Sequence, residues 1–297
     1  MKVFTLIIGV ALLAAAGYFV HVYLNNRSPV VVQVTETPTL ETPTPTPTPR
    51  PSPTASATSS PKPTPLTRLG YVRQQLLADG FDTAQVASIL ADARLKLYPI
   101  TQVAYKEPDW IVIKQKLYDP AFVQKGKDYI SANQAVFDSA EKDYGVPKEV
   151  LAGIIAIETE FGVSSGTTLT FNALYSRMEE WPATTWKAQA DQLVALSTYC
   201  LKSRVDCFAI KGSYAGALGI VQFMPDSLLA YGVDGNQDGV VDLYNPADAI
   251  PSAANFLARH DWAADHVKAL AGYYGSAVGY PEIVLNYASL LAGSAVY

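Results

Sequence analysis

Two acidic residues lie close together in the segment VPKEVLAGIIAIETEFG, where helical spacing would give them different surroundings. Leu151, Ile154 and Ile155 form one apolar stripe of a predicted helix, and Glu158 falls on the same stripe. Glu160 lies about 200° around a helix of 3.6 residues per turn, so we expect it to face water. A carboxyl group among apolar side chains keeps its proton to higher pH, as a general acid requires. Position alone favours a catalytic acid and a structural carboxylate, paired with a buried arginine or capping a backbone group, about equally.

A second segment, IKGSYAGALGIVQFMPDSLLAYG, is rich in small residues that let backbone segments approach closely and leave an open cleft. Gln222 within it supplies an amide suited to the hydroxyl or acetamido groups of a sugar. A tight helix-packing stretch would have the same composition, so this segment by itself does not identify a glycan site.

Oxygen-bearing side chains also cluster in DGNQDGVVDLYN, which fits the first part of a calcium-binding EF-hand loop. Asp234, Asn236 and Asp238 occupy positions 1, 3 and 5, and the carbonyl of Val240 occupies position 7. Position 12 is Asn245, so the usual bidentate glutamate is missing. A metal-free surface turn is the alternative. Calcium bound here would be structural and would take no part in the chemistry.

The elements that must position these groups are mostly helical. Apolar spacing predicts two short helices separated by Asp79-Gly80 and a longer helix from about Pro120 to Asp143. The best candidate for a short strand is VVDLY at 240–244. Strands do not alternate with helices as a parallel sheet requires, so the predicted fold class is mainly α.

The N-terminal residues predict a membrane segment. Residues 4–24 contain no Asp, Glu, Lys or Arg. At 1.5 Å per residue such a helix is about 31 Å long, which matches the bilayer core of about 30 Å. We therefore predict that residues 1–24 anchor an exported protein on the envelope side of the cytoplasmic membrane. A cleaved signal peptide is the alternative, because AAAG at 14–17 offers small residues.

The next region has the composition of a linker. Residues 28–67 hold 11 of the 20 prolines and no aromatic residue, so we predict a disordered Pro/Thr/Ser-rich linker over 25–67. Residues 68–297 then form the folded domain, with a net charge of −7. That sign argues against a nucleic-acid partner. The sequence has only three histidines, which argues against a multi-histidine metal site.

Cys200 and Cys207 are the only cysteines in the sequence. An even number in an exported chain indicates a disulfide, here closing a short loop. Two unpaired thiols are the alternative. The spacing lacks the C-x-x-C pattern of redox and metal sites.

Five blocks follow one another across most of residues 70–265: GFDTAQVASILADA, YDPAFVQKGKDYISANQAVFDSAEKDYGVP, IETEFG, KGSYAGALGIVQFMPDS and NPADAIPSAANFLARHDW. Their order and spacing resemble the lytic murein transglycosylases of the MltB type. The resemblance implies a lysozyme-like helical fold with a small EF-hand-like loop, peptidoglycan glycan strands as substrate, and Glu158 as catalytic acid/base. It also implies that Asp248 adds a carboxylate to the calcium loop.

The same resemblance implies which residues bind substrate. Ser213 and Gln222 fall at positions that contact the glycan, and Phe256 falls where the family has an aromatic sugar platform. Tyr273 is placed at the cleft, although the family's Tyr-Asn pair is replaced here by Tyr273-Tyr274-Gly275. Ordinary aromatic packing of Tyr273 is the alternative.

The chemistry implied by the resemblance is cleavage of the MurNAc–GlcNAc β-1,4 bond without water, giving 1,6-anhydro-MurNAc ends. The 6-hydroxyl of the same MurNAc would be the nucleophile, held close to C1. No cofactor is required, and the sequence identifies no protein partner. A muramidase that hydrolyses the same bond, or a non-catalytic glycan-binding module on a stalk, are the alternatives. The G-x-S-x-G pattern at 162–166, with His260 downstream, matches an α/β-hydrolase in order but lacks the preceding strand.

Overall fold

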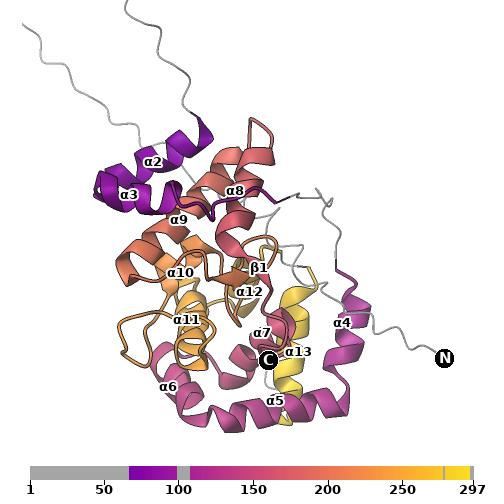
Figure 1. The fold of residues 1–297 in the computed structure, drawn as a ribbon. Helices are drawn as coiled ribbons and strands as arrows, with labels where there is room; N and C mark the ends of the chain where they lie inside the picture. Colours follow the sequence, from indigo (N-terminus) through magenta and orange to yellow (C-terminus); the bar gives the residue numbers. More distant parts are fainter. Residues whose placement is uncertain (1–66, 99–107, 277, 295–297) are drawn as a thin grey trace, which may run out of the picture.

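The computed structural model describes residues 67–98, 108–276 and 278–294 (Figure 1). The predicted membrane anchor at 1–24, and the linker up to residue 66, lie outside these described residues. Within them, no helix combines the length and the apolar character needed to span a bilayer.

Helices make up nearly all the regular structure in the described part of the chain, which confirms the mainly α prediction. In chain order the elements are α2 (Arg68–Ala78), α3 (Thr83–Leu90), α4 (Trp110–Leu117), α5 (Pro120–Ala132), α6 (Gln134–Tyr144), α7 (Lys148–Thr159), β1 (Thr168–Leu169), α8 (Thr170–Glu180), α9 (Trp186–Ser203), β2 (Lys211–Gly212), α10 (Pro225–Tyr231), α11 (Pro246–Arg259), α12 (His266–Tyr274) and α13 (Tyr280–Ala292).

Helix α7 lies in the centre of the body, and all of its residues from 150 to 159 are buried. It is enclosed by α13, α5, α6, α11 and α4, all of which contact it (Figure 1). Gly153 lets α13 pack closely, because a Cβ atom there would lie 3.3 Å from the carbonyl oxygen of Val284. Fully burying each large apolar side chain of this helix contributes roughly 1.5–3 kcal/mol. A helix that is apolar on every side is therefore stable only at this central position.

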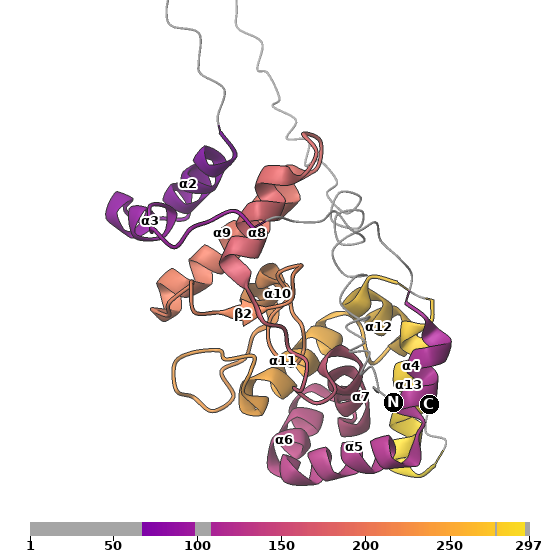
Figure 2. The same ribbon diagram turned by 45° about the vertical axis from the view of Figure 1, so that its right-hand side comes forward.

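In a second group of helices, α2, α8 and α10 pack against α9, and α3 packs against α2 (Figure 2). The predicted break at Asp79-Gly80 is confirmed, since α2 and α3 lie on either side of it. Asp82 caps α3 in a capping box with Gln85. Arg68 at the start of α2 donates to the carbonyl oxygens of Glu179 and Trp181, each at 2.8 Å. These bonds satisfy carbonyl groups at the end of α8 that have no partner within that helix.

Two element predictions are wrong. The single helix expected from Pro120 to Asp143 is divided at Asn133, whose side chain donates to the carbonyl oxygen of Tyr129 at 2.9 Å. An asparagine that bonds to its local backbone competes with helix continuation, which apolar spacing does not reveal. Residues 240–244 form turns and bends instead of a strand, and the only paired strands among the described residues are β1 and β2.

A disulfide between Cys200 and Cys207 lies at the C-terminal end of α9. Helix α9 stops at Arg204, which adopts the left-handed conformation with φ 56°. The chain then turns back, and Cys200 and Cys207 are joined with 5.6 Å between their Cα atoms. The bond ties the last turn of α9 to the segment that leads into β2.

Candidate active site

Glu158 lies in the last turn of the central helix α7. The helix ends there because Glu160 and Phe161 take left-handed conformations, with φ values of 54° and 64°, before Gly162 at 85°. Glu158 is only 9% exposed. Glu160 is half-buried and forms an ion pair with Lys116 of α4. Glu158 and Glu160 therefore have different surroundings, but Glu160 lies just after the helix, as its C-cap, and not on a water-facing side of it.

The hydrogen-bond partner of the Glu158 carboxyl group is a tyrosine. Tyr280, at the start of α13, donates its hydroxyl to Oε1 of Glu158 at 2.8 Å. The Tyr280 ring is fully buried and stacks on Tyr274, with 4.4 Å between ring centroids and 8° between planes. No ion pair involves Glu158 within the described residues, which disfavours a structural carboxylate held by an arginine.

Burial keeps the Glu158 carboxyl group mostly protonated at neutral pH. It raises the pKa of Glu158 from 4.5 to about 8, and the hydrogen bond from Tyr280 opposes only part of this shift. With a pKa one unit above the pH, about nine in ten molecules carry the proton at pH 7. Burial also raises the pKa of Tyr280 well above its usual value, so its hydroxyl stays a donor.

Residues 219–222, here called the inner segment, are held by hydrogen bonds from two helices. The hydroxyl of Thr159, next to Glu158, donates to the carbonyl oxygen of Ile220 at 2.9 Å. The Tyr273 hydroxyl donates to the carbonyl oxygen of Val221 at 2.7 Å. The structure therefore places the inner segment between the end of α7 and helix α12, and places Tyr273 beside it.

Gln222 in the inner segment has an unpaired acceptor. Its Nε2 donates to the carbonyl oxygens of Gly219 at 2.7 Å and Ser165 at 3.3 Å. Its Oε1 is buried and has no hydrogen-bond partner among the described residues. An unpaired buried acceptor costs about 1–3 kcal/mol, and such groups mark positions where a ligand can bind.

Ser213 and Phe256 are enclosed by their neighbours. Ser213 is 1% exposed, and its Oγ accepts from the backbone amide of Ala217 at 3.0 Å. Phe256 is 3% exposed and stacks on His260, with 3.9 Å between ring centroids. Its ring also lies 5.0 Å from that of Tyr273. In this conformation neither side chain presents a free surface of the kind that a sugar ring requires.

The α/β-hydrolase alternative is excluded by the local structure. The segment at 162–166 follows helix α7, where that motif needs a strand. His260 contacts the carbonyl oxygen of Phe256 through Nδ1 at 2.7 Å. Among the described residues, no hydrogen bond joins His260 to Ser164 or Ser165 of the motif.

The predicted calcium loop is organised by Asp248, which is fully buried. Its Oδ1 accepts from the amides of Gly235 at 3.0 Å and Asn236 at 3.3 Å, and its Oδ2 accepts from Asp242 at 2.7 Å. Asp234 accepts from two further loop amides. The donors are carboxylate and amide oxygens, which suit calcium in type. Across the described parts of the chain, however, no group of three or more His, Cys, Asp or Glu side chains is arranged to hold a metal ion.

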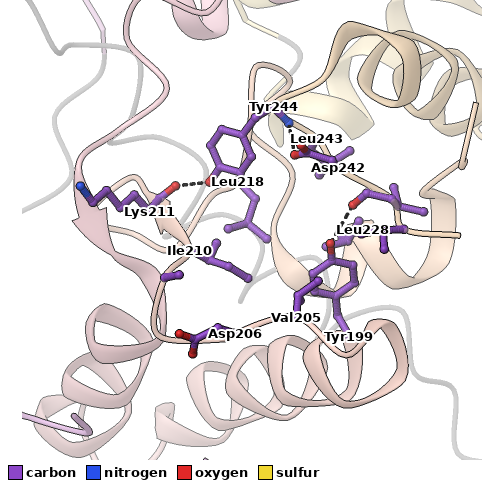
Figure 3. Close-up of a pocket in the computed structure, with 13 residues that line it drawn as sticks. Tyr199, Val205, Asp206, Ile210, Lys211, Leu218, Leu228, Asp242, Leu243 and Tyr244 are labelled. Carbon is purple, nitrogen blue, oxygen red and sulfur yellow. Dashed lines mark hydrogen bonds between the residues drawn. The ribbon is translucent and has the colours of Figure 1, made fainter. Parts of the chain in front are cut away.

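A cavity of about 460 Å³ lies between the end of α9 and this loop (Figure 3). The hydroxyl of Tyr199 bonds to the carbonyl oxygen of Val241 across one side, and that of Tyr244 bonds to the carbonyl oxygen of Lys211 across another. Neither Glu158 nor Gln222 lines it. The cavity therefore separates the loop from the disulfide segment and is distinct from the site around Glu158.

A helical body whose central helix ends in a buried, protonated glutamate has the architecture of the lysozyme-like fold. Residues 67–271 match the family described as Transglycosylase SLT domain. The chain belongs to that family.

Named relatives agree with this assignment. The chain is 33% identical to membrane-bound lytic murein transglycosylase B of Escherichia coli (strain K12) over 230 residues, covering 71% of this chain. It spans 62% of the length of that relative. Escherichia coli lytic transglycosylase Slt35 in complex with calcium has the same fold, with a TM-score of 0.66 and 22% identity over 77% of this chain and 94% of that one. SltB3 from Pseudomonas aeruginosa in complex with NAG-anhNAM-pentapeptide gives a TM-score of 0.57 and 25% identity over 65% of this chain and 52% of that one.

Sequence reasoning missed Tyr280, the hydrogen-bond partner of the catalytic candidate. It lies 122 residues after Glu158, so no local pattern connects the two. The only signal is Tyr280-Pro281 at the start of a helix, with the proline in its first turn. That signal predicts where α13 begins, but it does not identify the carboxyl group that the tyrosine reaches.

Proposed function

We propose that this protein is a peptidoglycan lytic transglycosylase that cleaves the MurNAc–GlcNAc β-1,4 bond and leaves 1,6-anhydro-MurNAc ends. The observation that carries the proposal is the buried Glu158, whose pKa is raised to about 8 and whose carboxyl group accepts a hydrogen bond from Tyr280. Family membership and the anhydro-muropeptide complex of the relative SltB3 support it.

One carboxyl group can serve both halves of this reaction. Protonated Glu158 donates to the glycosidic oxygen as the bond from C1 breaks, and GlcNAc leaves with that proton. The Glu158 carboxylate then removes the proton of the MurNAc 6-hydroxyl as its oxygen bonds to C1. The acid form is restored and no water is consumed. Because the nucleophile belongs to the bound sugar, its attack is effectively unimolecular.

A hydrolytic mechanism with two carboxylates is less well supported. Such enzymes need a second acid about 5–9.5 Å from the first. Glu160, the nearest acid along the chain, is held by Lys116 on α4. Asp191, in the stretch between the matching blocks, accepts from the hydroxyl of Tyr71 at 2.7 Å. Neither interaction orients a carboxylate toward Glu158.

Product analysis tests the proposed reaction. We expect digestion of purified peptidoglycan to release muropeptides that end in 1,6-anhydro-MurNAc, each lighter by one water than the hydrolysed product, as measured by mass spectrometry. Reducing MurNAc ends would instead identify a muramidase. Binding to peptidoglycan without release of fragments would identify a glycan-binding module.

Gln222 is the best-supported substrate contact among the proposed binding residues. Its unpaired Oε1 is available to a hydroxyl or amide donor of the glycan. The resemblance also places Ser213, Phe256 and Tyr273 at the substrate. In this proposal they support the site instead: Ser213 closes the turn before the inner segment, Tyr273 bonds to that segment, and Phe256 packs against Tyr273.

We also propose that the loop from Asp234 binds a structural calcium ion, through Asp234, Asn236, Asp238, the Val240 carbonyl and Asp248. The oxygen donors and the calcium complex of Slt35 support this. Calcium at 100 times its Kd would add about 2.7 kcal/mol to the free energy of unfolding. Differential scanning calorimetry is therefore expected to show a melting temperature several degrees higher with calcium.

The double variant Asp234→Ala/Asp238→Ala is the control for the calcium site, and it should show no shift with calcium. Magnesium serves as a second control ion, because it demands shorter bonds and a stricter octahedral geometry than calcium. An unchanged melting curve of the native protein on adding calcium would remove the site from the proposal.

Residues 4–24 are proposed to hold the protein at the envelope side of the cytoplasmic membrane. The length and composition of this segment support the proposal, as does the membrane-bound relative in Escherichia coli. Recovery of the protein in the soluble envelope fraction, with residues 1–16 removed, would show a cleaved signal peptide instead.

A further inference from the structure

The cavity between the end of α9 and residues 240–244 has the size and the lining of a small-molecule site (Figure 3). Its volume of about 460 Å³ falls within the range of about 300–1,000 Å³ that is typical of ligand pockets. Apolar walls are the second property of such pockets. Most of the lining side chains are aliphatic, namely those of Val205, Ala209, Ile210, Leu218, Leu228, Val240, Val241 and Leu243.

The cavity has an apolar floor and a polar mouth. The floor consists of the lining residues that are buried in the core, which are Leu218, Leu228 and Leu243, each at most 5% exposed. The mouth includes the charged lining residues, all of them exposed, which are Asp206, Lys211 and Asp242. A ligand that fits both regions has an apolar part for the floor and a polar part for the mouth.

The two hydroxyl groups of the cavity wall are already bonded to the protein. Tyr199 donates to the carbonyl oxygen of Val241 at 2.9 Å, and Tyr244 donates to that of Lys211. Burial raises the pKa of both tyrosines to about 12, so neither hydroxyl is ionised at neutral pH. A water molecule in a cavity needs two to four polar partners, and hydroxyls that are already bonded offer few. A hydrocarbon group therefore displaces water from this space at little cost.

The charges at the mouth favour an uncharged head group. Asp206 forms an ion pair with Arg94 at 2.7 Å. The carboxylate of Asp242 accepts from the amide of Tyr244 at 2.9 Å, and Lys211 extends its ammonium group away from the cavity (Figure 3). Asp242 and Lys211 have opposite signs, so the mouth favours neither an anion nor a cation. A hydroxyl group, which both donates and accepts, suits these neighbours.

We propose that this cavity binds the hydrocarbon chain of an uncharged single-chain lipid, whose hydroxyl head group lies at the mouth beside Asp206, Lys211 and Asp242. An apolar cavity of about 150 Å³ holds one benzene molecule, so a cavity of about 460 Å³ has room for a chain of about ten carbons. Neither Glu158 nor Gln222 lines the cavity. The lipid site is therefore separate from the glycan site and does not depend on the proposed function.

Isothermal titration calorimetry of the native protein with 1-hexanol, 1-octanol and 1-decanol tests the site. Each additional CH₂ group buried in the cavity is expected to raise the affinity about fourfold. Decanoate and decylammonium carry a chain of similar length with a charged head, and each is expected to bind about tenfold more weakly than 1-decanol. An affinity that does not grow with chain length, or tighter binding of either charged compound, would overturn the proposal.

The variant Ala209→Trp tests where the alcohol binds. Ala209 is an exposed lining residue, and a tryptophan ring there takes up part of the cavity. It is expected to weaken the binding of 1-decanol at least about tenfold, because less apolar surface remains for the chain. Ala84→Trp on α3 is the matched control, since Ala84 is also exposed but does not line the cavity, and it should bind as the native protein does. Equal affinities of the two variants would contradict the site.

A crystal structure of the native protein with 10-bromodecan-1-ol locates the chain without any substitution, so it decides the question even if Ala209→Trp does not fold. The anomalous signal of bromine is expected at the floor, beside Leu218, Leu228 and Leu243. A bromine signal only elsewhere, or none at a concentration that saturates binding in calorimetry, would refute the proposal. Failure of the proposed glycan cleavage is distinguishable, because none of these measurements uses a glycan.

Discussion

Glu158→Gln is expected to lower the rate of glycan cleavage at least about a thousandfold while glycan binding survives. The amide keeps the shape of the side chain but has no acidic proton to donate and cannot act as base in the second half of the reaction. General acid–base catalysis contributes typically 10²–10⁴-fold, and here one group would supply both steps. The release of anhydro-muropeptides measures the rate, and sedimentation with insoluble peptidoglycan measures binding. Equal turnover by the variant would end the proposal that this protein is an enzyme acting through Glu158.

The same substitution is expected to change stability with a particular dependence on pH. The pKa of Glu158 is about 8 in the folded protein and 4.5 without the fold's influence, so the folded state binds the proton more tightly. Between about pH 4.5 and about pH 8, the Glu158 carboxyl group ionises in the unfolded chain but keeps its proton in the folded protein. The free energy of unfolding therefore falls as pH rises through this range. At pH 7 the loss is about 3 kcal/mol.

The Glu158→Gln variant has no carboxyl group to ionise at this position, so it does not lose this stability. Its free energy of unfolding should exceed that of the native protein by an amount that grows from about pH 4.5 to about pH 8. Urea denaturation at pH 5 and pH 7.5 measures the difference. A constant difference between the two pH values would contradict a raised pKa for Glu158.

Tyr280→Phe is expected to reduce kcat/KM about 10- to 100-fold and to move the alkaline limb of the pH profile upward. The hydroxyl of Tyr280 stabilises the ionised form of Glu158 and fixes its carboxyl group. Without this bond the pKa of Glu158 rises further above 8, so the acid form persists to higher pH. The carboxyl group also loses its orientation, which lowers the rate. Tyr280 is thus a positioning residue, and the pH profile of kcat/KM is the measurement that a merely structural role would not change.

Tyr287→Phe provides the matched control. Tyr287 lies on the same helix α13, is also fully buried, and donates its hydroxyl to the carbonyl oxygen of Phe122 at 3.0 Å, away from Glu158. It should lose a comparable amount of stability and keep the alkaline limb in place. Identical pH profiles for the two variants would refute the role of Tyr280.

The helix around Glu158 was predictable from the sequence because its information is local. Leu151, Ile154 and Ile155 define one face within two turns, and Glu158 shares it, so the helical period predicts a buried Glu158. The structure goes further, because residues 150–159 are buried on all sides of the helix. The capping box of Asp82 and Gln85 at the start of α3 is likewise a pattern of neighbouring residues. Local patterns of this kind fix which side of an element is buried.

Features that depend on distant residues were not predictable in the same way. Tyr280 reaches Glu158 only after α12 and α13 fold back onto α7. Phe256 could be placed by resemblance, but its exposure depends on His260, Tyr273 and neighbouring rings that cover it. The segment at 240–244 has the composition of a strand, yet the carboxylate of Asp248 takes the amide of Asp242 that a strand partner would need. In each case a tertiary contact overrode the local preference.

The hydroxyls of Thr159 and Tyr273 donate to two consecutive carbonyl groups, those of Ile220 and Val221. These two hydrogen bonds restrain the inner segment, so we expect Gln222 to keep its position relative to Glu158 when a sugar binds. The entropy cost of ordering this segment is met during folding. Binding of the proposed glycan substrate therefore does not have to order it again. Under the proposed function, a small molecule that copies the shape of the oxocarbenium-like sugar is expected to bind without a rearrangement of the inner segment.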